Sequence, residues 1–228
     1  MERSQAAEWL VTAEIAGRRA RTARRASWIP LAVLGVITLG AMPLYRFPTA
    51  SGSGEIVIRG VRSFGPLSWF AGGFFLRNPA AVSLYWLIAL PVGYVATALV
   101  YRLRAGRRGV GGTRWQYVVT GVALFGVLIL SAVLGRTQPG DLFIRGLTPL
   151  IPIAAGLFVL AAVERSLPLL AFAVAFLGLT LTVNLYDVEN LFARIGVSVP
   201  TPAIGLILPG AMLLGGAMGF WLAGRRTA

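Results

Sequence analysis

The chain contains no cysteine and no histidine, and each absence removes whole classes of chemistry. A chain without thiols forms no disulfide and supplies no thiolate nucleophile or thiolate metal ligand. A chain without imidazole supplies no histidine ligand for haem or zinc and no Ser–His–Asp triad. We therefore expect no catalytic residue of these types, no metal ion and no cofactor.

Lysine is also absent, so all 21 basic residues are arginine, against only 8 Asp and Glu. Arginine without lysine, together with abundant alanine and glycine, is typical of a GC-rich bacterial genome. The net charge of +13 does not predict nucleic-acid binding, because the arginines are split between the ends of several apolar segments. The loop RAGRRGVGG lacks the lysine and hydroxyl residue of a phosphate-binding loop.

Long apolar stretches dominate the chain, which is 57% hydrophobic and 13% charged. A helix needs about 20 apolar residues to cross the hydrocarbon core of a membrane. Six stretches satisfy this length and predict an all-α integral membrane protein with a six-span helical bundle. The predicted spans are residues 28–45, 80–101, 115–135, 147–163, 167–186 and 202–223. A seventh stretch, FGPLSWFAGGFFL at 64–76, is shorter and interrupted by proline and glycine, and suits an interfacial or re-entrant segment.

The arginines predict how this bundle is oriented. One side of the predicted bundle has 14 Arg and four Glu, and the other has seven Arg and four acidic residues. The positive-inside rule then places both termini in the cytoplasm of a bacterial cell. Residues 1–26 are expected to form a basic amphipathic helix on the cytoplasmic surface, and residues 27–228 a multi-pass transmembrane domain. This helix would contact anionic headgroups, unless its arginines only determine topology.

Two segments on the predicted outer side share a pattern of charge. GEIVIRGV places Glu55 four residues before Arg59, and GDLFIRGL places Asp141 four residues before Arg145. At this spacing the acid and the arginine lie on one face of a helix or of a strand and form an ion pair. Each segment lies between an odd-numbered and an even-numbered span. A third outer segment fits more loosely, with Asn190 four residues before Arg194. The repeat suggests three duplicated helical hairpins, with coincidence as the alternative.

The segment NLYDVENLFARIG, at the end of the fifth predicted span, carries a third group of polar residues. If the helix continues through it, Asn184, Asp187, Asn190 and Arg194 share one face. We interpret them as a structural polar network in which Asp187 pairs with Arg194, and a ligand or ion site is the alternative. A double-mutant cycle on Asp187 and Arg194 distinguishes the two, because only the network predicts coupled losses of thermal stability.

Small residues recur every fourth position in the last predicted span. Ala211, Gly215 and Gly219 form a stripe that lets another helix approach closely. We predict that this helix belongs to the same chain, and a homo-oligomer contact is the alternative.

Three classes of function are compatible with these patterns. We rank first a non-catalytic accessory or partner-binding subunit of a membrane complex. Second is a transport component, because six spans behind a cytoplasmic surface helix resemble, in topology alone, the permease half of an ATP-binding-cassette exporter. Third is an intramembrane enzyme acting on lipids through the outer carboxylates Glu55, Asp141, Asp187 and Glu189. Arginine beside such acids stabilises the carboxylate and makes it a weak base, which places the enzyme last.

The predicted topology is tested by labelling single cysteines, since the chain has no native thiol. A cysteine replacing Ser53 should react with an impermeant maleimide added to intact cells. A cysteine replacing Gly109 should react only after the cells are permeabilised. Labelling of the Gly109 variant in intact cells would reverse the predicted orientation.

Overall fold

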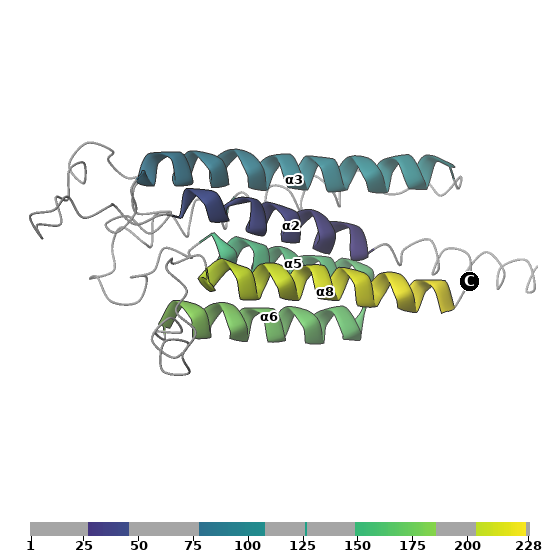
Figure 1. Cartoon of the computed structure of the whole chain (residues 1–228). Coiled ribbons are helices and arrows are strands. Elements are labelled where there is room, and N and C mark those ends of the chain that lie inside the picture. Colours follow the sequence, from purple (N-terminus) through teal and green to yellow (C-terminus); the bar gives the residue numbers. More distant parts are fainter. Residues whose placement is uncertain (1–26, 46–77, 108–125, 127–148, 186–203, 227–228) are drawn as a thin grey trace, which may run out of the picture.

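The computed structural model describes residues 27–45, 78–107, 126, 149–185 and 204–226, and the regular structure in these ranges is entirely helical (Figure 1). Its elements are α2 (Trp28–Gly40), η1 (Met42–Leu44), α3 (Pro79–Arg107), α5 (Leu150–Glu164), α6 (Leu167–Leu185) and α8 (Ile204–Arg226). The all-helical prediction is therefore confirmed for the described part of the chain.

Three of the described helices are long and apolar enough to cross a membrane. The qualifying segments are Ala80–Val100, Leu167–Asn184 and Gly205–Arg225, with 21, 18 and 21 residues. At a rise of about 1.5 Å per residue, 18 residues extend roughly 27 Å, close to the thickness of the hydrocarbon core. These helices match three of the predicted spans and indicate a multi-pass membrane protein.

The other predicted spans have different outcomes. The stretches 28–45 and 147–163 correspond to apolar helices of fewer than 18 residues, Trp28–Leu44 and Leu150–Glu164. Their described parts are therefore helical as predicted, but shorter than the three helices above. The predicted span 115–135, apart from residue 126, lies outside the described residues, as do residues 1–26 and 64–76.

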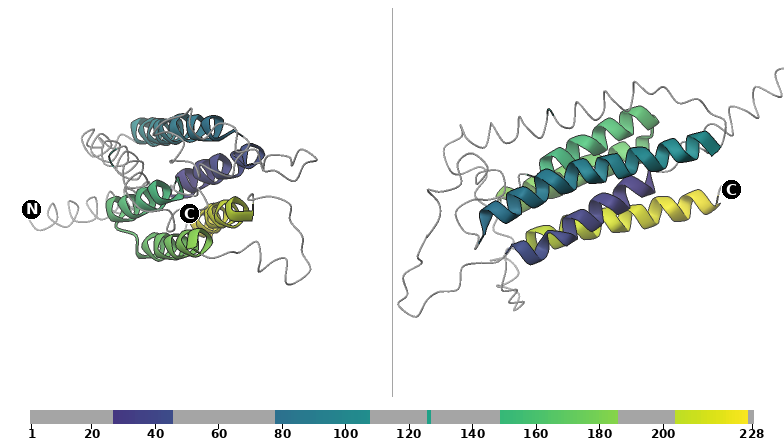
Figure 2. Two further views of the ribbon diagram at one scale, coloured as in Figure 1. Left: turned by 90° about the vertical axis from the view of Figure 1, so that its left-hand side faces the viewer. Right: turned by 90° about the horizontal axis from the view of Figure 1, so that it is seen from above.

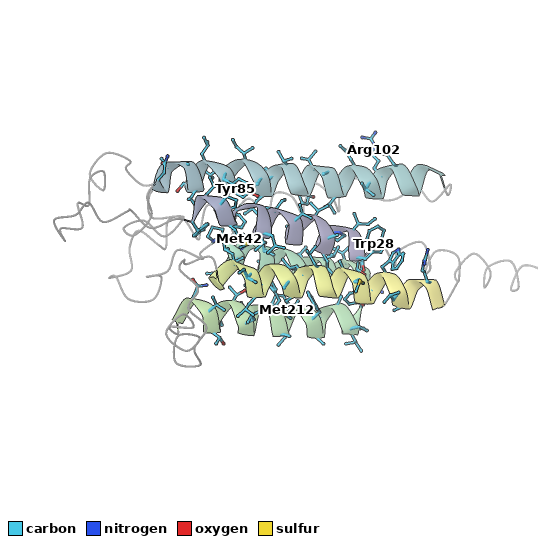
Figure 3. The ribbon with its side chains drawn as sticks, viewed as in Figure 1. Trp28, Met42, Tyr85, Arg102 and Met212 are labelled. Atoms are coloured by element: carbon cyan, nitrogen blue, oxygen red, sulfur yellow. The ribbon has the colours of Figure 1, made fainter. Side chains whose placement is uncertain are left out.

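The helices form a bundle in which α3 contacts α2, α2 contacts α8, α8 contacts α6 and α6 contacts α5. Helix α5 lies behind α8 in the view of Figure 1, and Figure 2 shows the bundle from two further sides. We call the two ends of this bundle the Trp28 end and the Tyr85 end, after residues labelled in Figure 3. Helix α2 begins at the Trp28 end, and α3 and α8 run antiparallel to it. Helices α5 and α6 form a hairpin whose turn lies at the Trp28 end.

The α5–α6 turn is short because α5 ends in a left-handed residue. Arg165 has φ 49° and ψ 45°, and among the described residues it is the one non-glycine with positive φ. The N–H of Ser166 then reaches back to the carbonyl of Ala161 at 3.1 Å, which satisfies one of the last carbonyls of α5. Helix α6 begins at the next residue, so the two helices are held antiparallel.

Helices α2 and α8 approach each other closely because each places a glycine opposite a leucine of the other. A Cβ atom built on Gly35 would lie 2.8 Å from Cδ2 of Leu214, and one built on Gly210 would lie 2.5 Å from Cδ2 of Leu39. Real Cβ atoms do not come this close to another side chain. The missing side chains therefore allow leucines from both helices to interlock.

Side chains also pack over glycines where α2 contacts α3 and where α6 contacts α8. Ile37 of α2 occupies the space over Gly93 of α3, and Phe172 of α6 occupies the space over Gly216 of α8. Phe172 also packs edge-to-face with Phe220, at 6.2 Å between ring centroids and 82° between planes. These contacts attach α3 to α2 and α6 to α8.

The predicted packing stripe on α8 is not used in these contacts. Ala211, Gly215 and Gly219 are exposed, and no atom lies within 4 Å of a Cβ built on Gly215 or Gly219. Close approach within the described bundle depends instead on Gly210 and Gly216. The predicted contact of the stripe with another helix therefore stays a prediction. Because α8 is apolar on every side, its composition does not show which face meets another helix.

Leucine substitutions at two glycines of α8 test this assignment. Gly210→Leu should lower the melting temperature in detergent by several degrees, because overpacking a helix contact costs about 1–3 kcal/mol. Gly215→Leu adds the same side chain in open space and should leave the melting temperature unchanged or slightly raised. Equal effects of the two substitutions would contradict the described α2–α8 contact.

Candidate functional site

Buried aromatic residues join the end of α2 to the start of α3 at the Tyr85 end of the bundle (Figure 3). Tyr45 and Trp86 are both almost wholly buried, and the Trp86 Nε1–H donates to the Tyr45 hydroxyl oxygen at 3.0 Å. The ring of Tyr85 packs edge-to-face on Trp86, with centroids 5.6 Å apart. We call these three residues the aromatic clamp.

Tyr85 completes the clamp with a hydrogen bond to the backbone of α2. Its hydroxyl donates to the carbonyl oxygen of Ile37 at 2.7 Å. The same hydroxyl lies over Gly40, where an added Cβ would be 2.8 Å from it. The clamp therefore fixes the last turn of α2 against α3.

Local sequence explains why α3 begins at Pro79, shortly before the clamp residues Tyr85 and Trp86. The Asn78 side-chain oxygen accepts the backbone N–H of Ala81 at 3.2 Å, which caps the helix, and Pro79 is its first residue. Asparagine at the cap and proline at the first position are favoured at helix starts. Sequence reasoning missed this cap and the clamp, although the Asn–Pro pair was a usable signal.

A second polar cluster lies on α6, in the same half of the bundle. Thr180 is fully buried and Asn184 is 5% exposed, one helical turn apart on the same face. The Asn184 Nδ2 donates to the carbonyl of Thr180 at 2.9 Å. Within the described residues, the Thr180 hydroxyl oxygen and the Asn184 Oδ1 have no hydrogen-bond partner. We call these two residues the Thr180–Asn184 pair.

Other threonines in the bundle donate their hydroxyl hydrogen bonds to carbonyls of their own helix. Thr38 donates to the carbonyl of Leu34, and Thr182 donates to the carbonyl of Gly178, both at 2.8 Å. Such a bond to the preceding turn is the usual solution for a threonine in an apolar helix. Thr180 therefore differs from the equally buried Thr38 in its unpaired oxygen, and from the exposed Thr182 in its burial as well.

Exposed arginines mark the opposite end of the bundle. Arg102 of α3, Arg165 of the α5–α6 turn and Arg225 of α8 are all exposed at the Trp28 end. The guanidinium carbon of Arg225 lies 4.1 Å above the ring of Trp221, a cation–π contact. A tryptophan that holds an arginine near the end of a membrane helix is suited to the headgroup region, where one part is apolar and the other charged.

Most of the predicted site residues fall outside the described ranges. Of the predicted polar network, Asn184 is described and is 5% exposed. The predicted partners of Asn184 and the outer ion pairs stay predictions: Asp187, Asn190, Arg194, Glu55, Arg59, Asp141 and Arg145. Within the described residues, no group of three His, Cys, Asp or Glu side chains could hold a metal ion.

Comparison with protein-family models, with curated proteins and with solved structures finds no match to this chain. The chemistry of the described residues is therefore the basis for assigning a function. These residues offer neutral hydrogen-bonding groups inside the bundle and cationic groups on one end.

Two phenylalanine substitutions test the energetic role of the aromatic clamp. Tyr45→Phe leaves the buried Trp86 N–H without its acceptor, which should cost about 1–3 kcal/mol. Tyr85→Phe should cost less, because the Ile37 carbonyl still accepts the N–H of Ala41 at 3.2 Å. Thermal unfolding in detergent should therefore show the larger loss for Tyr45→Phe. The reverse order would contradict the Trp86–Tyr45 bond.

Proposed function

We propose that the protein is a six-span, non-catalytic accessory subunit of a bacterial cytoplasmic membrane complex. In this proposal the Trp28 end faces the cytoplasm and binds a partner protein together with anionic lipid headgroups. The observation that carries the proposal is the gathering of exposed arginines at that end, with Arg225 stacked on Trp221.

The directions of the described helices support the six-span count. Helix α3 ends at the Trp28 end, whereas α5 begins at the Tyr85 end (Figure 1). The connection 108–149 must therefore join opposite ends of the bundle. A span at 115–135, as the sequence predicts, accounts for that passage. The count is then even, which agrees with α2 beginning and α8 ending at the same end.

Charge supports the cytoplasmic orientation of the Trp28 end. The segment 1–26, which precedes α2, contains six arginines, and three more follow Arg102 before residue 109. These segments continue from helix termini at the Trp28 end. A cluster of arginines beside spanning helices is retained in the cytoplasm and attracts anionic lipid, at about 1 kcal/mol for each residue near the surface.

A transport component is the second candidate, and the Thr180–Asn184 pair is the observation that favours it. Polar groups inside a membrane bundle often line a path for a solute or an ion. Proline within a spanning helix, as at Pro91 and Pro209, also leaves a backbone carbonyl without its helical N–H donor. Transporters use such free carbonyls to bind ions. The exposed arginines lie on the surface of the Trp28 end, where a partner or lipid binds, and not in the interior, where a transport path runs. They therefore favour the accessory function.

Co-purification from native membranes in mild detergent tests the proposed function. In a triple variant, Arg102, Arg165 and Arg225 are each replaced by Gln. A matched control variant replaces Arg62, Arg77 and Arg136, which the sequence places on the opposite side. The triple variant should retain several-fold less partner protein and anionic lipid than the parent, and the control should retain both.

The result has two contrary outcomes. Equal retention by the triple variant and the control would remove the arginine end from the binding surface and overturn the proposal. An ATPase as the stoichiometric partner of the parent would support the transport component instead.

A further inference from the structure

The buried face of α6 is a regular seam of apolar side chains, interrupted by Thr180 and followed by Asn184. Leu169, Ala173, Phe176, Thr180 and Val183 recur at alternating steps of four and three residues, and each is at most 2% exposed. This spacing is that of a helix packed along its length against neighbours, here α5 and α8. The seam places a hydroxyl group where every other position is apolar.

The unpaired atoms of the Thr180–Asn184 pair are both oxygens on this face. Asn184 donates its amide N–H to the Thr180 carbonyl, so its Oδ1 remains an acceptor without a partner among the described residues, as does the Thr180 hydroxyl oxygen. Buried polar atoms almost always have a partner, because a buried oxygen without one loses the hydrogen bonds it makes in water. Two such atoms one turn apart indicate a shared partner.

By residue count, helix α8 carries a backbone carbonyl without its usual helical donor near the level of Thr180. Phe172 of α6 lies opposite Gly216 of α8, and the two helices run antiparallel. Counting eight residues forward from Phe172 on α6 and eight residues back from Gly216 on α8 places Thr180 level with residue 208. Pro209 has no N–H, so the carbonyl of the buried Gly205 lacks the donor that an ordinary helix would give it.

We propose that the Thr180–Asn184 pair, with the Gly205 carbonyl, binds a small hydrogen-bond donor inside the bundle. The guest must donate or be cationic, because the available atoms accept hydrogen bonds. It must also be small, since both side chains are at least 95% buried. A water molecule or a monovalent cation fits both conditions. The neutral lining favours water, because an uncompensated charge is far costlier to bury.

Thermal unfolding of the full chain in detergent tests this site, because one substitution should change the melting temperature in opposite directions with and without a guest. If the Thr180 oxygen had no partner, Thr180→Val would remove a buried unpaired group and raise the melting temperature. If a guest is bound, Thr180→Val should lower it by about 2–4 °C or more, and Thr180→Ser should restore part of the loss. Thr182→Val is the matched control, because its hydroxyl is exposed and bonds to its own helix.

A double-mutant cycle tests whether the two residues share one guest. With a shared guest, Thr180→Val and Asn184→Leu together should cost clearly less than the sum of their separate losses. The loss from Thr180→Val should also persist in an Arg194→Gln background. A melting temperature of Thr180→Val at or above the parent, additive losses, or disappearance of the loss in the Arg194→Gln background would each overturn the proposal.

Salt identity then distinguishes the two guests. The parent is unfolded in sodium, potassium, ammonium and N-methylglucamine chloride at equal ionic strength. Equal melting temperatures in all four salts identify water. A higher melting temperature in the small cations, which Thr180→Val abolishes, identifies a cation. The proposed function does not depend on this site, so loss of one leaves the other standing.

Discussion

The close antiparallel contact between α2 and α8 is the constraint on which the other described contacts depend. Inside a membrane, lipid tails are as apolar as leucine, so helices gain little by hiding apolar surface from their surroundings. They associate where side chains interlock, and Gly35 and Gly210 supply the space for Leu214 and Leu39. Helix α3 is then attached through α2, and the α5–α6 hairpin through α8.

The two ends of the bundle differ in the interactions that hold them. At the Tyr85 end, helices are tied by buried hydrogen bonds, such as Trp86 Nε1–H to Tyr45, that a low-dielectric environment strengthens. At the Trp28 end, a two-residue turn joins α5 to α6 and arginines are exposed. One end is thus suited to rigidity and the other to contact with charged groups. This difference, seen among the described residues, is what supports our proposal that a partner and lipid bind at the Trp28 end.

The interior of the bundle is apolar except at a few neutral polar residues, and these residues have different roles. Thr38 bonds to its own helix, and Tyr45 and Trp86 bond to each other across two helices. In the equally buried Thr180–Asn184 pair, the Asn184 amide N–H bonds to its own helix, but the Thr180 hydroxyl oxygen and the Asn184 Oδ1 have no partner among the described residues. Its oxygens are therefore the polar atoms in the described interior that call for a guest, whichever of the two candidate functions is correct.

The sequence by itself determined the helices, because an apolar run in a membrane satisfies its backbone hydrogen bonds only by coiling. Helices α3, α6 and α8 overlap their predicted spans closely, and Asn184 was singled out from the sequence as a member of a polar network. The glycine, tyrosine and tryptophan contacts were not predictable in the same way. On α8, the stripe through Ala211 and the face through Gly210 are equally apolar, so hydropathy does not distinguish a face that meets lipid from one that meets a helix. Tyr45 and Trp86 are 41 residues apart in sequence, and only the packing of α3 against α2 brought them together.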